Sequence, residues 1–204
     1  DAHWIDTIYH GLPADLLRPR PVKPGYLAVL GRMAPEKAVD RAIHIARRAG
    51  MPLKIAAKVD PVDRQYFEHE IRPLLELPGI EYIGEISDAE KSEFLSGAIG
   101  LLMPIDWPEP FGLVMIEAMA CGTPVLAYPG GSVPEIVEDG LTGFIVTNEA
   151  EAVDAVRRLP DLSRKRIRAR FEERFTARRM AEDYLALYRR MAETHAPKLR
   201  VVKA

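Results

Sequence analysis

Six short apolar runs alternate with stretches of helical pattern along this 204-residue chain, and that alternation constrains its fold more than any other feature. Near-continuous hydrophobicity within several runs is typical of strands covered on both faces, as in a parallel sheet. Strands and helices in alternation imply right-handed crossovers and a doubly wound α/β fold. We expect strands at 26–30, 53–57, 80–83, 99–103, 124–127 and 143–146, and helices at 36–49, 61–77, 88–96, 111–120, 133–138, 149–158, 161–173 and 177–194.

The carboxyl ends of these strands are where the chemistry is expected. In doubly wound sheets, ligands bind in the crevice beyond those ends. The sequence therefore predicts a site built from the loops that follow Leu30, Ala57, Ile83, Met103 and Ala127.

The charge balance and the cysteine and histidine content exclude several kinds of site. The chain has 28 Lys and Arg against 30 Asp and Glu, so nothing global favours nucleic acid as a partner. Its one cysteine, Cys121, rules out an internal disulfide framework and suits a reducing cytoplasm. The five histidines show no metal-ligand spacing, so we expect no metal. No apolar run approaches the roughly 18 residues of a membrane span.

Two cations follow the first expected strand, five residues apart. Gly31 allows close backbone approach, and Arg32 and Lys37 precede an expected helix, whose N-terminus attracts anions. A guanidinium and an ammonium in such a place suit a diphosphate. Taken alone, the pattern fits solvated loop cations paired with Glu36 or Asp40 better.

The stretch 109–125 combines an acid in a Pro-punctuated turn with a second acid inside an apolar helical run. Glu109 precedes Pro-Phe-Gly, and Glu117 stands among Val, Met, Ile and Ala. A buried carboxylate needs a partner, because burying it unpaired is expensive. Two acids separated by seven residues suit a ligand with several hydroxyl groups. The structural alternatives are a helix-terminal acid for Glu109 and a salt-bridge partner for Glu117.

This stretch resembles the Glu-x7-Glu signature of retaining glycosyltransferases of family 4 (glycosyltransferase group 1), including the Pro-Phe-Gly insert and the following Glu-Ala-x-Ala-x-Gly-x-Pro-Val run. The resemblance implies a Rossmann-like sheet that forms the C-terminal, donor-binding half of a GT-B enzyme. It also implies transfer of a hexosyl group from a nucleoside diphosphate sugar, UDP- or GDP-linked, with retention of configuration and without a cofactor. The acceptor, a carbohydrate or a lipid, is not identified.

The resemblance also assigns roles to residues of this chain. Arg32 and Lys37 would stabilise the departing diphosphate, and Glu109 would lie against the donor sugar. Glu117 would accept hydrogen bonds from the ribose hydroxyls. The other donor-binding positions it implies are Gly31, Lys58, Ile83, Glu85, Phe111, Gly112, Leu113, Gly130 and Gly131.

Several of these positions have ordinary alternatives. Lys58 stands where many relatives carry glycine, and it either reaches a phosphate or points into water. The loop 83–87 is also a plain strand-to-helix turn, with Ser87 and Glu90 in a capping-box pattern. Ser132, after the Gly-Gly turn, is expected to be an ordinary N-cap. Ala38 replaces the family's usual glycine, which a helix should tolerate or even prefer.

The ends of the chain carry separate expectations. We expect residues 1–24 to be an incoming segment and linker from a missing N-terminal domain, 25–195 to be the nucleotide-sugar-binding domain, and 196–204 to be a frayed tail. The basic run 164–179 is either a solvated helical face, which we favour, or a surface that docks on anionic lipid at the inner face of the membrane. A cytoplasmic location is expected in both cases.

Two other functions fit the same motifs. A non-catalytic nucleotide-sugar-binding module would share the fold, although intact Arg32, Lys37, Glu109 and Glu117 favour an enzyme. A GT-B epimerase or sugar phosphorylase is the alternative among enzymes.

Overall fold

The computed structural model describes residues 4–195. Residues 1–3 lie outside the described part, as does the segment 196–204 for which we predicted a frayed tail.

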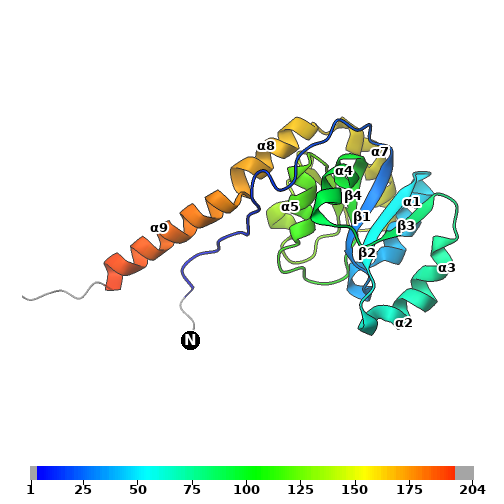
Figure 1. The fold of residues 1–204 in the computed structure, drawn as a ribbon, viewed down its shortest axis with the longest axis horizontal. Helices are drawn as coiled ribbons and strands as arrows, with labels where there is room; N and C mark the ends of the chain where they lie inside the picture. The colour runs from blue at the N-terminus through cyan, green and yellow to red at the C-terminus, as the bar shows by residue number, and fades with distance from the viewer. Residues whose placement is uncertain (1–3, 196–204) are drawn as a thin grey trace, which may run out of the picture.

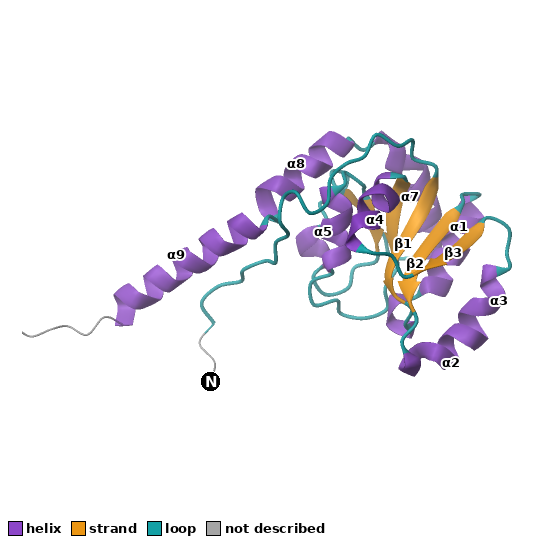
Figure 2. Ribbon diagram, in the orientation of Figure 1, coloured by secondary structure: helices purple, strands orange, loops and turns teal. Residues whose placement is uncertain are grey.

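A six-stranded parallel sheet forms the centre of the described part, in the order β3-β2-β1-β4-β5-β6 (Figures 1 and 2). This order reverses between β1 and β4, which makes that junction the expected ligand crevice. All six strands lie where the apolar runs predicted them, and the doubly wound, Rossmann-like α/β fold is confirmed. The strands are β1 (Tyr26–Arg32), β2 (Leu53–Lys58), β3 (Ile80–Gly84), β4 (Ala98–Met103), β5 (Val125–Ala127) and β6 (Gly143–Ile145).

Both faces of the sheet are buried, which is why its strands read as continuous apolar runs. Side chains alternate between faces along a strand, so Leu27 and Val29 join one core cluster whereas Ala28 joins the other. The face that contains Leu27 is covered by α1 (Val39–Ala49), α2 (Arg64–Tyr66), α3 (Arg72–Leu75) and α7 (Glu149–Arg158). The opposite face is covered by α4 (Asp88–Ser96), α5 (Leu113–Ala120), α6 (Val133–Ile136) and α8 (Arg164–Arg174).

The expected helix at 36–49 is broken, and the break lies next to Lys37. A 3-10 turn covers Pro35–Lys37, and α1 begins only at Val39. Ala38 between them has φ 49° and ψ 52°, the left-handed region that glycine favours. The expectation that a helix would accommodate alanine here is therefore wrong, because position 38 is not helical.

The expected helix at 61–77 is also irregular. A 3-10 turn at Pro61–Asp63 leads into α2, which passes through a π-helical turn at Phe67–Ile71 before α3. Pro73 lacks the N–H that would continue α-helical bonding, and a π turn is one of the ways in which a helix absorbs such a defect.

The N-terminal segment packs along the helices of one face. Leu17 is buried, and the backbone N–H groups of Arg18 and Arg20 donate to the hydroxyls of Ser92 and Ser96. The last helix, α9 (Ala177–His195), leaves the body of the domain beside this segment (Figure 1).

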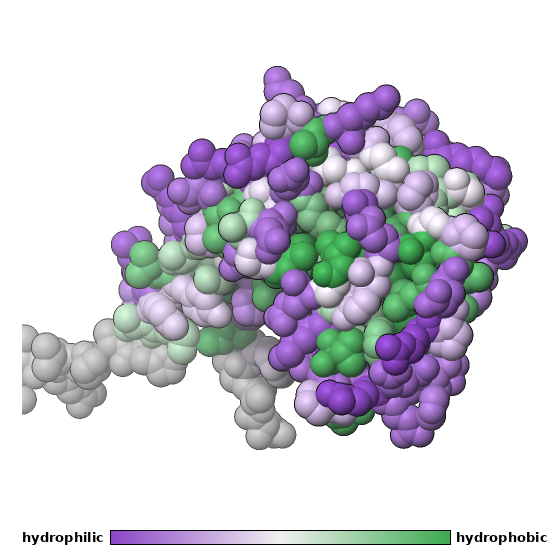
Figure 3. All heavy atoms as spheres, turned by 45° about the vertical axis from the view of Figure 1, so that its right-hand side comes forward, coloured by the Kyte–Doolittle hydropathy of each residue, from purple (hydrophilic) through white to green (hydrophobic). Residues whose placement is uncertain are grey.

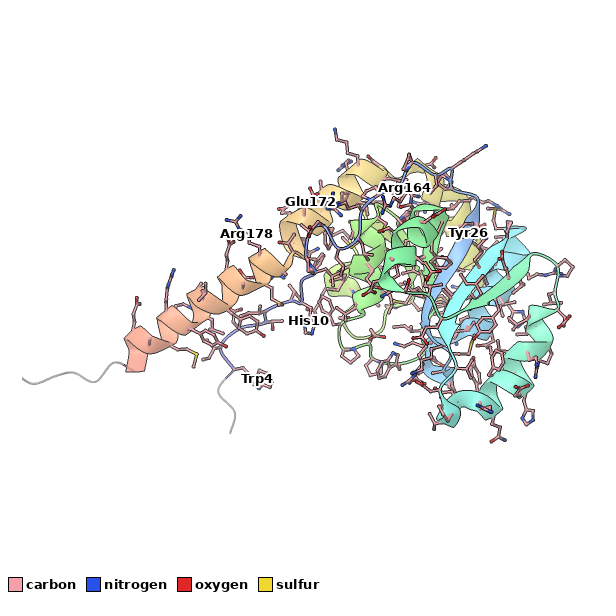
Figure 4. The ribbon with its side chains drawn as sticks, viewed as in Figure 1. Trp4, His10, Tyr26, Arg164, Glu172 and Arg178 are labelled. Carbon is pink, nitrogen blue, oxygen red and sulfur yellow. The ribbon has the colours of Figure 1, made fainter. Side chains whose placement is uncertain are left out.

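The basic run 164–179 is used mostly inside the chain, so the expectation of a solvated face is wrong for much of it. Arg164, which Figure 4 labels near the start of α8, donates to the carbonyls of Ser96 and Ala98. Arg168 donates to the carbonyls of Ala14 and Leu17, which fixes the N-terminal segment. Within residues 4–195, no helix is long and apolar enough to cross a lipid bilayer.

Candidate functional site

A cavity of about 290 Å³ opens at the junction of β1 and β4, where the strand order reverses. Its floor consists of residues 29–31 of β1 and of Leu102, Met103 and Ile105 at and just after the end of β4. Its walls carry Arg32, Lys37, Glu109 and residues 110–114 at the start of α5. Sequence reasoning placed the site beyond the carboxyl ends of the strands, and the largest group of its candidate residues meets there.

Glu109 and Lys37 form a close ion pair in this cavity. Glu109 is 7% exposed, and its Oε2 accepts from Lys37 Nζ at 2.5 Å. The same oxygen accepts from the indole Nε1 of Trp107 at 3.0 Å. Lys37 Nζ also lies 4.8 Å from the centre of the Trp107 ring, close enough for a cation–π interaction. The carboxylate therefore meets the partner requirement that its burial creates.

The loop that carries Glu109 is supported from behind by the Gly-Gly turn. A Cβ at Gly130 would lie 2.5 Å from the carbonyl oxygen of Trp107, and one at Gly131 would lie 2.2 Å from that of Glu109. Ser132 donates its backbone N–H to Glu109 and its hydroxyl to the carbonyl of Phe111, both at 2.8 Å. Ser132 is the N-cap residue of α6, as predicted, but its side chain makes no capping bond to that helix. Its hydroxyl is used to hold the loop.

Arg32 is held at the rim of the cavity by two carboxylates. It pairs with Glu36, and its Nε lies 3.5 Å from Oδ2 of Asp63. That oxygen of Asp63 is buried and has no hydrogen bond among the described residues. Pairing of Arg32 with Glu36 was the ordinary alternative for this motif, and it is present. The guanidinium nevertheless lines the cavity.

A second cavity, of about 310 Å³, adjoins the first across Gly31 and Leu113, which line both. Glu117 of α5 lines it and accepts from Lys91 Nζ of α4 at 2.9 Å. Burial lowers the pKa of Lys91, but hydrogen bonds to Asp88 and Glu117 outweigh that effect and leave the pKa raised. Glu117 is thus a salt-bridge partner, and it also faces a cavity.

Lys58 and Glu85 also line this second cavity. A hydrogen bond to Asp60 raises the pKa of Lys58, whose Nζ lies 2.9 Å from Oδ1 of that carboxylate. The capping box predicted for the neighbouring loop is present, because Ser87 donates its backbone N–H to Glu90 at 2.8 Å.

The start of α5 lies between the two cavities. Gly112 precedes the helix with φ 74°, a conformation that favours glycine, so α5 begins at Leu113 and not at Phe111 as predicted. The first N–H groups of a helix have no partner within it, so this turn offers donors to an anion. Leu113 is 48% exposed above them.

Not every predicted donor-binding residue lies in these cavities. Gly130 and Gly131 line a separate groove, together with residues 105–108. Ile83 lies on β3, is 38% exposed and lines neither cavity. The other predicted residues line one cavity or both: Gly31, Arg32, Lys37, Lys58, Glu85, Glu109, Phe111, Gly112, Leu113 and Glu117.

Four residues of the site were missed by sequence reasoning. Trp107 has the clearest signal, an indole two residues before an acid in a Pro-rich loop. His10 belongs to the N-terminal segment (Figure 4). It lines the first cavity, and its ring packs edge-on against that of Phe111 with 4.9 Å between the ring centres. Lys91 and Asp63 depend on tertiary contacts that no local pattern specifies.

The described residues contain no group of three or more His, Cys, Asp or Glu side chains that could hold a metal ion. Cys121 follows the last residue of α5 and is buried, and burial raises the pKa of its thiol to about 11.

Figure 3 shows hydrophobic side chains gathered near the middle of one face of the domain, with hydrophilic side chains around them.

The comparisons with known proteins agree with this architecture. The family model "Glycosyl transferases group 1" matches residues 18–178. An alpha-maltose-1-phosphate synthase from Mycolicibacterium smegmatis is 28% identical over 92% of the chain and 52% of that protein. The chain spans about half the length of the curated relatives that it matches.

Two solved structures are similar to the chain. The sucrose-phosphate synthase from Thermosynechococcus elongatus has a TM-score of 0.77 and 25% identity, and the match covers 91% of this chain and 52% of that one. Anabaena HepE, solved in complex with UDP and glucose, has a TM-score of 0.76 and 20% identity over 89% of this chain and 56% of its own. At this identity the likeness to HepE shows the fold alone.

Proposed function

The chain belongs to the glycosyl transferases group 1 family, and on this premise we propose that it is the donor-binding half of a hexosyltransferase that uses a nucleoside diphosphate sugar. The observation that carries the proposal is the pair of adjoining cavities at the strand reversal. One cavity holds Lys37 with Glu109, the other holds Lys91 with Glu117, and the first turn of α5 lies between them.

The first cavity suits the sugar and the diphosphate. Lys37 supplies a compact ammonium and Arg32 a planar guanidinium, which together match the charge of a diphosphate. The N–H groups at the start of α5, after Gly112, add donors for an anion. Glu109 would accept hydrogen bonds from the hydroxyls of the donor sugar.

The second cavity suits the nucleoside. Glu117 would accept from the ribose hydroxyls, with Lys91 orienting its carboxylate. Lys58 and Glu85 would border the base and ribose, and backbone groups near Ile83 would read the base. HepE shares this fold and was solved with UDP and glucose, which supports a uridine nucleotide as the first probe.

The reaction follows from where charge develops. The bond between the anomeric carbon and the diphosphate oxygen breaks, so positive charge grows on the sugar and negative charge on the departing phosphate. Glu109 would stabilise the former, and Arg32 and Lys37 the latter. The acceptor hydroxyl then forms the new bond from the same face, which retains the anomeric configuration, and its proton goes to the departing phosphate oxygen.

Residues 25–195 are proposed as the nucleotide-sugar-binding domain, and 1–24 as the segment through which an N-terminal, acceptor-binding domain would join. Because the acceptor site would lie mainly in that domain, the 204-residue chain alone is expected to bind donor but transfer sugar poorly. The single cysteine supports a cytoplasmic location. Contact with a lipid surface would depend on exposed basic residues such as Lys165 and Arg178.

Titration calorimetry of the chain with UDP, GDP and ADP and their glucose and mannose derivatives, with and without EDTA, tests the proposal. We expect saturable, EDTA-insensitive binding of one diphosphate. Glu117→Ala should weaken binding of UDP and of uridine more than tenfold, since both carry the ribose. Arg32→Ala should weaken the binding of UDP more than that of uridine, because only UDP has the diphosphate.

Glu81→Ala is the matched control, since Glu81 also pairs with a lysine, Lys54 at 3.0 Å, but lines neither cavity. Its affinities should equal those of the unmodified chain. Undiminished affinity in Glu117→Ala would overturn the ribose assignment, and equal losses for UDP and uridine in Arg32→Ala would overturn the diphosphate assignment. Epimerisation of free UDP-sugar, or consumption of orthophosphate, would identify the enzyme alternatives.

A further inference from the structure

Trp107 joins the two loops that form the first cavity. One loop carries Lys37, in the 3-10 turn Pro35–Lys37, and the other carries Glu109. A backbone hydrogen bond from Asp106 N to Glu36 O, 3.0 Å long, ties the loops together beside the indole. The ring lies under Lys37 Nζ at 4.8 Å, and its Nε1 donates to Glu109 at 3.0 Å.

The two donors reach the same oxygen of Glu109. Lys37 Nζ and Trp107 Nε1 both bond to Oε2, and among the hydrogen bonds of residues 4–195 none goes to Oε1. Oε1 is therefore the oxygen of this carboxylate that a ligand would meet. The two hydrogen bonds to Oε2 fix the carboxylate group, and they therefore set the direction in which Oε1 points.

The two bonds to Oε2 respond differently to a bound diphosphate. Lys37 is 27% exposed at its side chain and is drawn toward an arriving anion, which weakens its hold on Glu109. The indole N–H is neutral and has no attraction of that strength for a phosphate, so it stays with the carboxylate. The backbone of Trp107 is also fixed by packing, because its carbonyl lies against Gly130 with no room for a Cβ there.

We propose that Trp107 is a positioning residue that keeps Oε1 of Glu109 directed at the donor sugar after Lys37 has turned to the diphosphate. This inference rests on the proposed function, and it adds a residue that would affect sugar binding through Glu109 without touching the sugar. It predicts that loss of the indole N–H affects nucleotide sugars and spares nucleotides. A residue needed only for folding would affect both.

Trp107→Phe is the decisive variant, because phenylalanine keeps an aromatic face under Lys37 and removes only the N–H donor and part of the ring. The affinities of this variant for UDP-glucose, GDP-mannose, UDP and GDP are measured by calorimetry. Affinity for the nucleotide sugar should fall about tenfold, which is the scale of one hydrogen bond to a charged group, and affinity for the nucleotide should fall less than twofold. Trp4→Phe is the control, because Trp4 is 89% exposed and lies at the outer end of the N-terminal segment (Figure 4).

The control variant supplies a second measurement that does not depend on Trp107→Phe folding. The chain has two tryptophans, so Trp4→Phe leaves Trp107 as the only one. Saturation with the nucleotide sugar should change its emission, since the ligand would meet both of its partners. Unchanged emission at saturation would overturn the inference, and so would equal losses for nucleotide and nucleotide sugar in Trp107→Phe. If the unmodified chain binds none of the four probes, the proposed function fails and the inference fails with it.

Discussion

Replacing Ala38 by glycine tests the backbone conformation on which the position of Lys37 depends. Ala38 has φ 49° and is the one non-glycine residue with positive φ among residues 4–195. It is also 4% exposed, so the substitution removes a buried methyl group as well as a backbone restriction. These two effects oppose each other, and their sum can be estimated.

Three contributions decide the change in the free energy of unfolding. Relief of the left-handed conformation is worth roughly 1–2 kcal/mol to the folded state. Glycine's extra freedom in the unfolded chain costs about 0.5–1 kcal/mol. Loss of one buried methyl group costs about 0.8 kcal/mol. The sum is near zero, although alanine-to-glycine changes at buried helical sites are ordinarily destabilising.

Ala155→Gly is the matched comparison, since Ala155 is 3% exposed inside α7. There the helical cost of glycine, about 1 kcal/mol, adds to the loss of the methyl group, with no strain to relieve. Thermal unfolding should show a melting temperature about 4–7 °C lower for Ala155→Gly and within about 2 °C of the original for Ala38→Gly. A loss in Ala38→Gly as large as that in Ala155→Gly would refute the left-handed conformation at position 38.

Two further predictions concern titrating groups. Burial raises the pKa of Cys121 to about 11 from 9.0, so its neutral thiol contributes stability that is present below about pH 9 and lost as pH rises toward 11. The native chain should therefore react with a disulfide reagent at pH 8 only as fast as it opens, and rapid stoichiometric labelling would contradict this. At Glu138, burial raises the pKa, but hydrogen bonds from Arg170 and Arg174 outweigh that effect and leave the pKa lowered. The ionised Glu138 therefore contributes stability to the fold above pH 4.5, and this stability is lost as the pH falls through the lowered pKa of the folded state. In urea unfolding, Glu138→Gln should be less stable than the original at pH 7, and the difference should narrow as the pH falls below 4.5; a difference that does not change with pH would refute the assignment.

The sheet was predictable from sequence because a strand buried on both faces is a nearly continuous run of apolar residues. Strands such as 98–103 carry no polar side chain, and the intervening helices are long enough to be recognised. Departures arise where one residue competes with the pattern. Ala38 and Pro73 interrupt helices whose side-chain pattern continues, so the pattern alone extends each helix too far.

The candidate site was predictable only where its residues belong to a contiguous motif. Glu109, Gly112 and Glu117 lie in one stretch whose spacing is visible. Asp63 and Lys91 reach the site from other elements, and their contacts depend on how α4 and the turn before α2 pack. Gly130 and Gly131 were identified as special, but the reason is packing against the loop of Glu109.

Gly112, which lies between Glu109 and Glu117, explains why these two acids face different cavities. A continuous helix would place residues eight apart a little more than two turns along the axis and about 80° around it, close enough for both carboxylates to face one cavity. Because Gly112 is left-handed, Glu109 lies in a loop and only Glu117 is helical, so each acid faces its own cavity.

Each carboxylate is also paired with a lysine from a different element, Lys37 with Glu109 and Lys91 with Glu117. These two ion pairs hold the charged groups of the site in place around the start of α5. In a donor, a diphosphate separates the sugar from the ribose, so the sugar would face Glu109, the ribose would face Glu117, and the diphosphate charge would lie at the helix start. On this argument, inserting one alanine between Gly112 and Leu113 should abolish binding of the nucleotide sugar while leaving the sheet intact, as measured by calorimetry and circular dichroism. Retained affinity would mean that the two cavities do not act together.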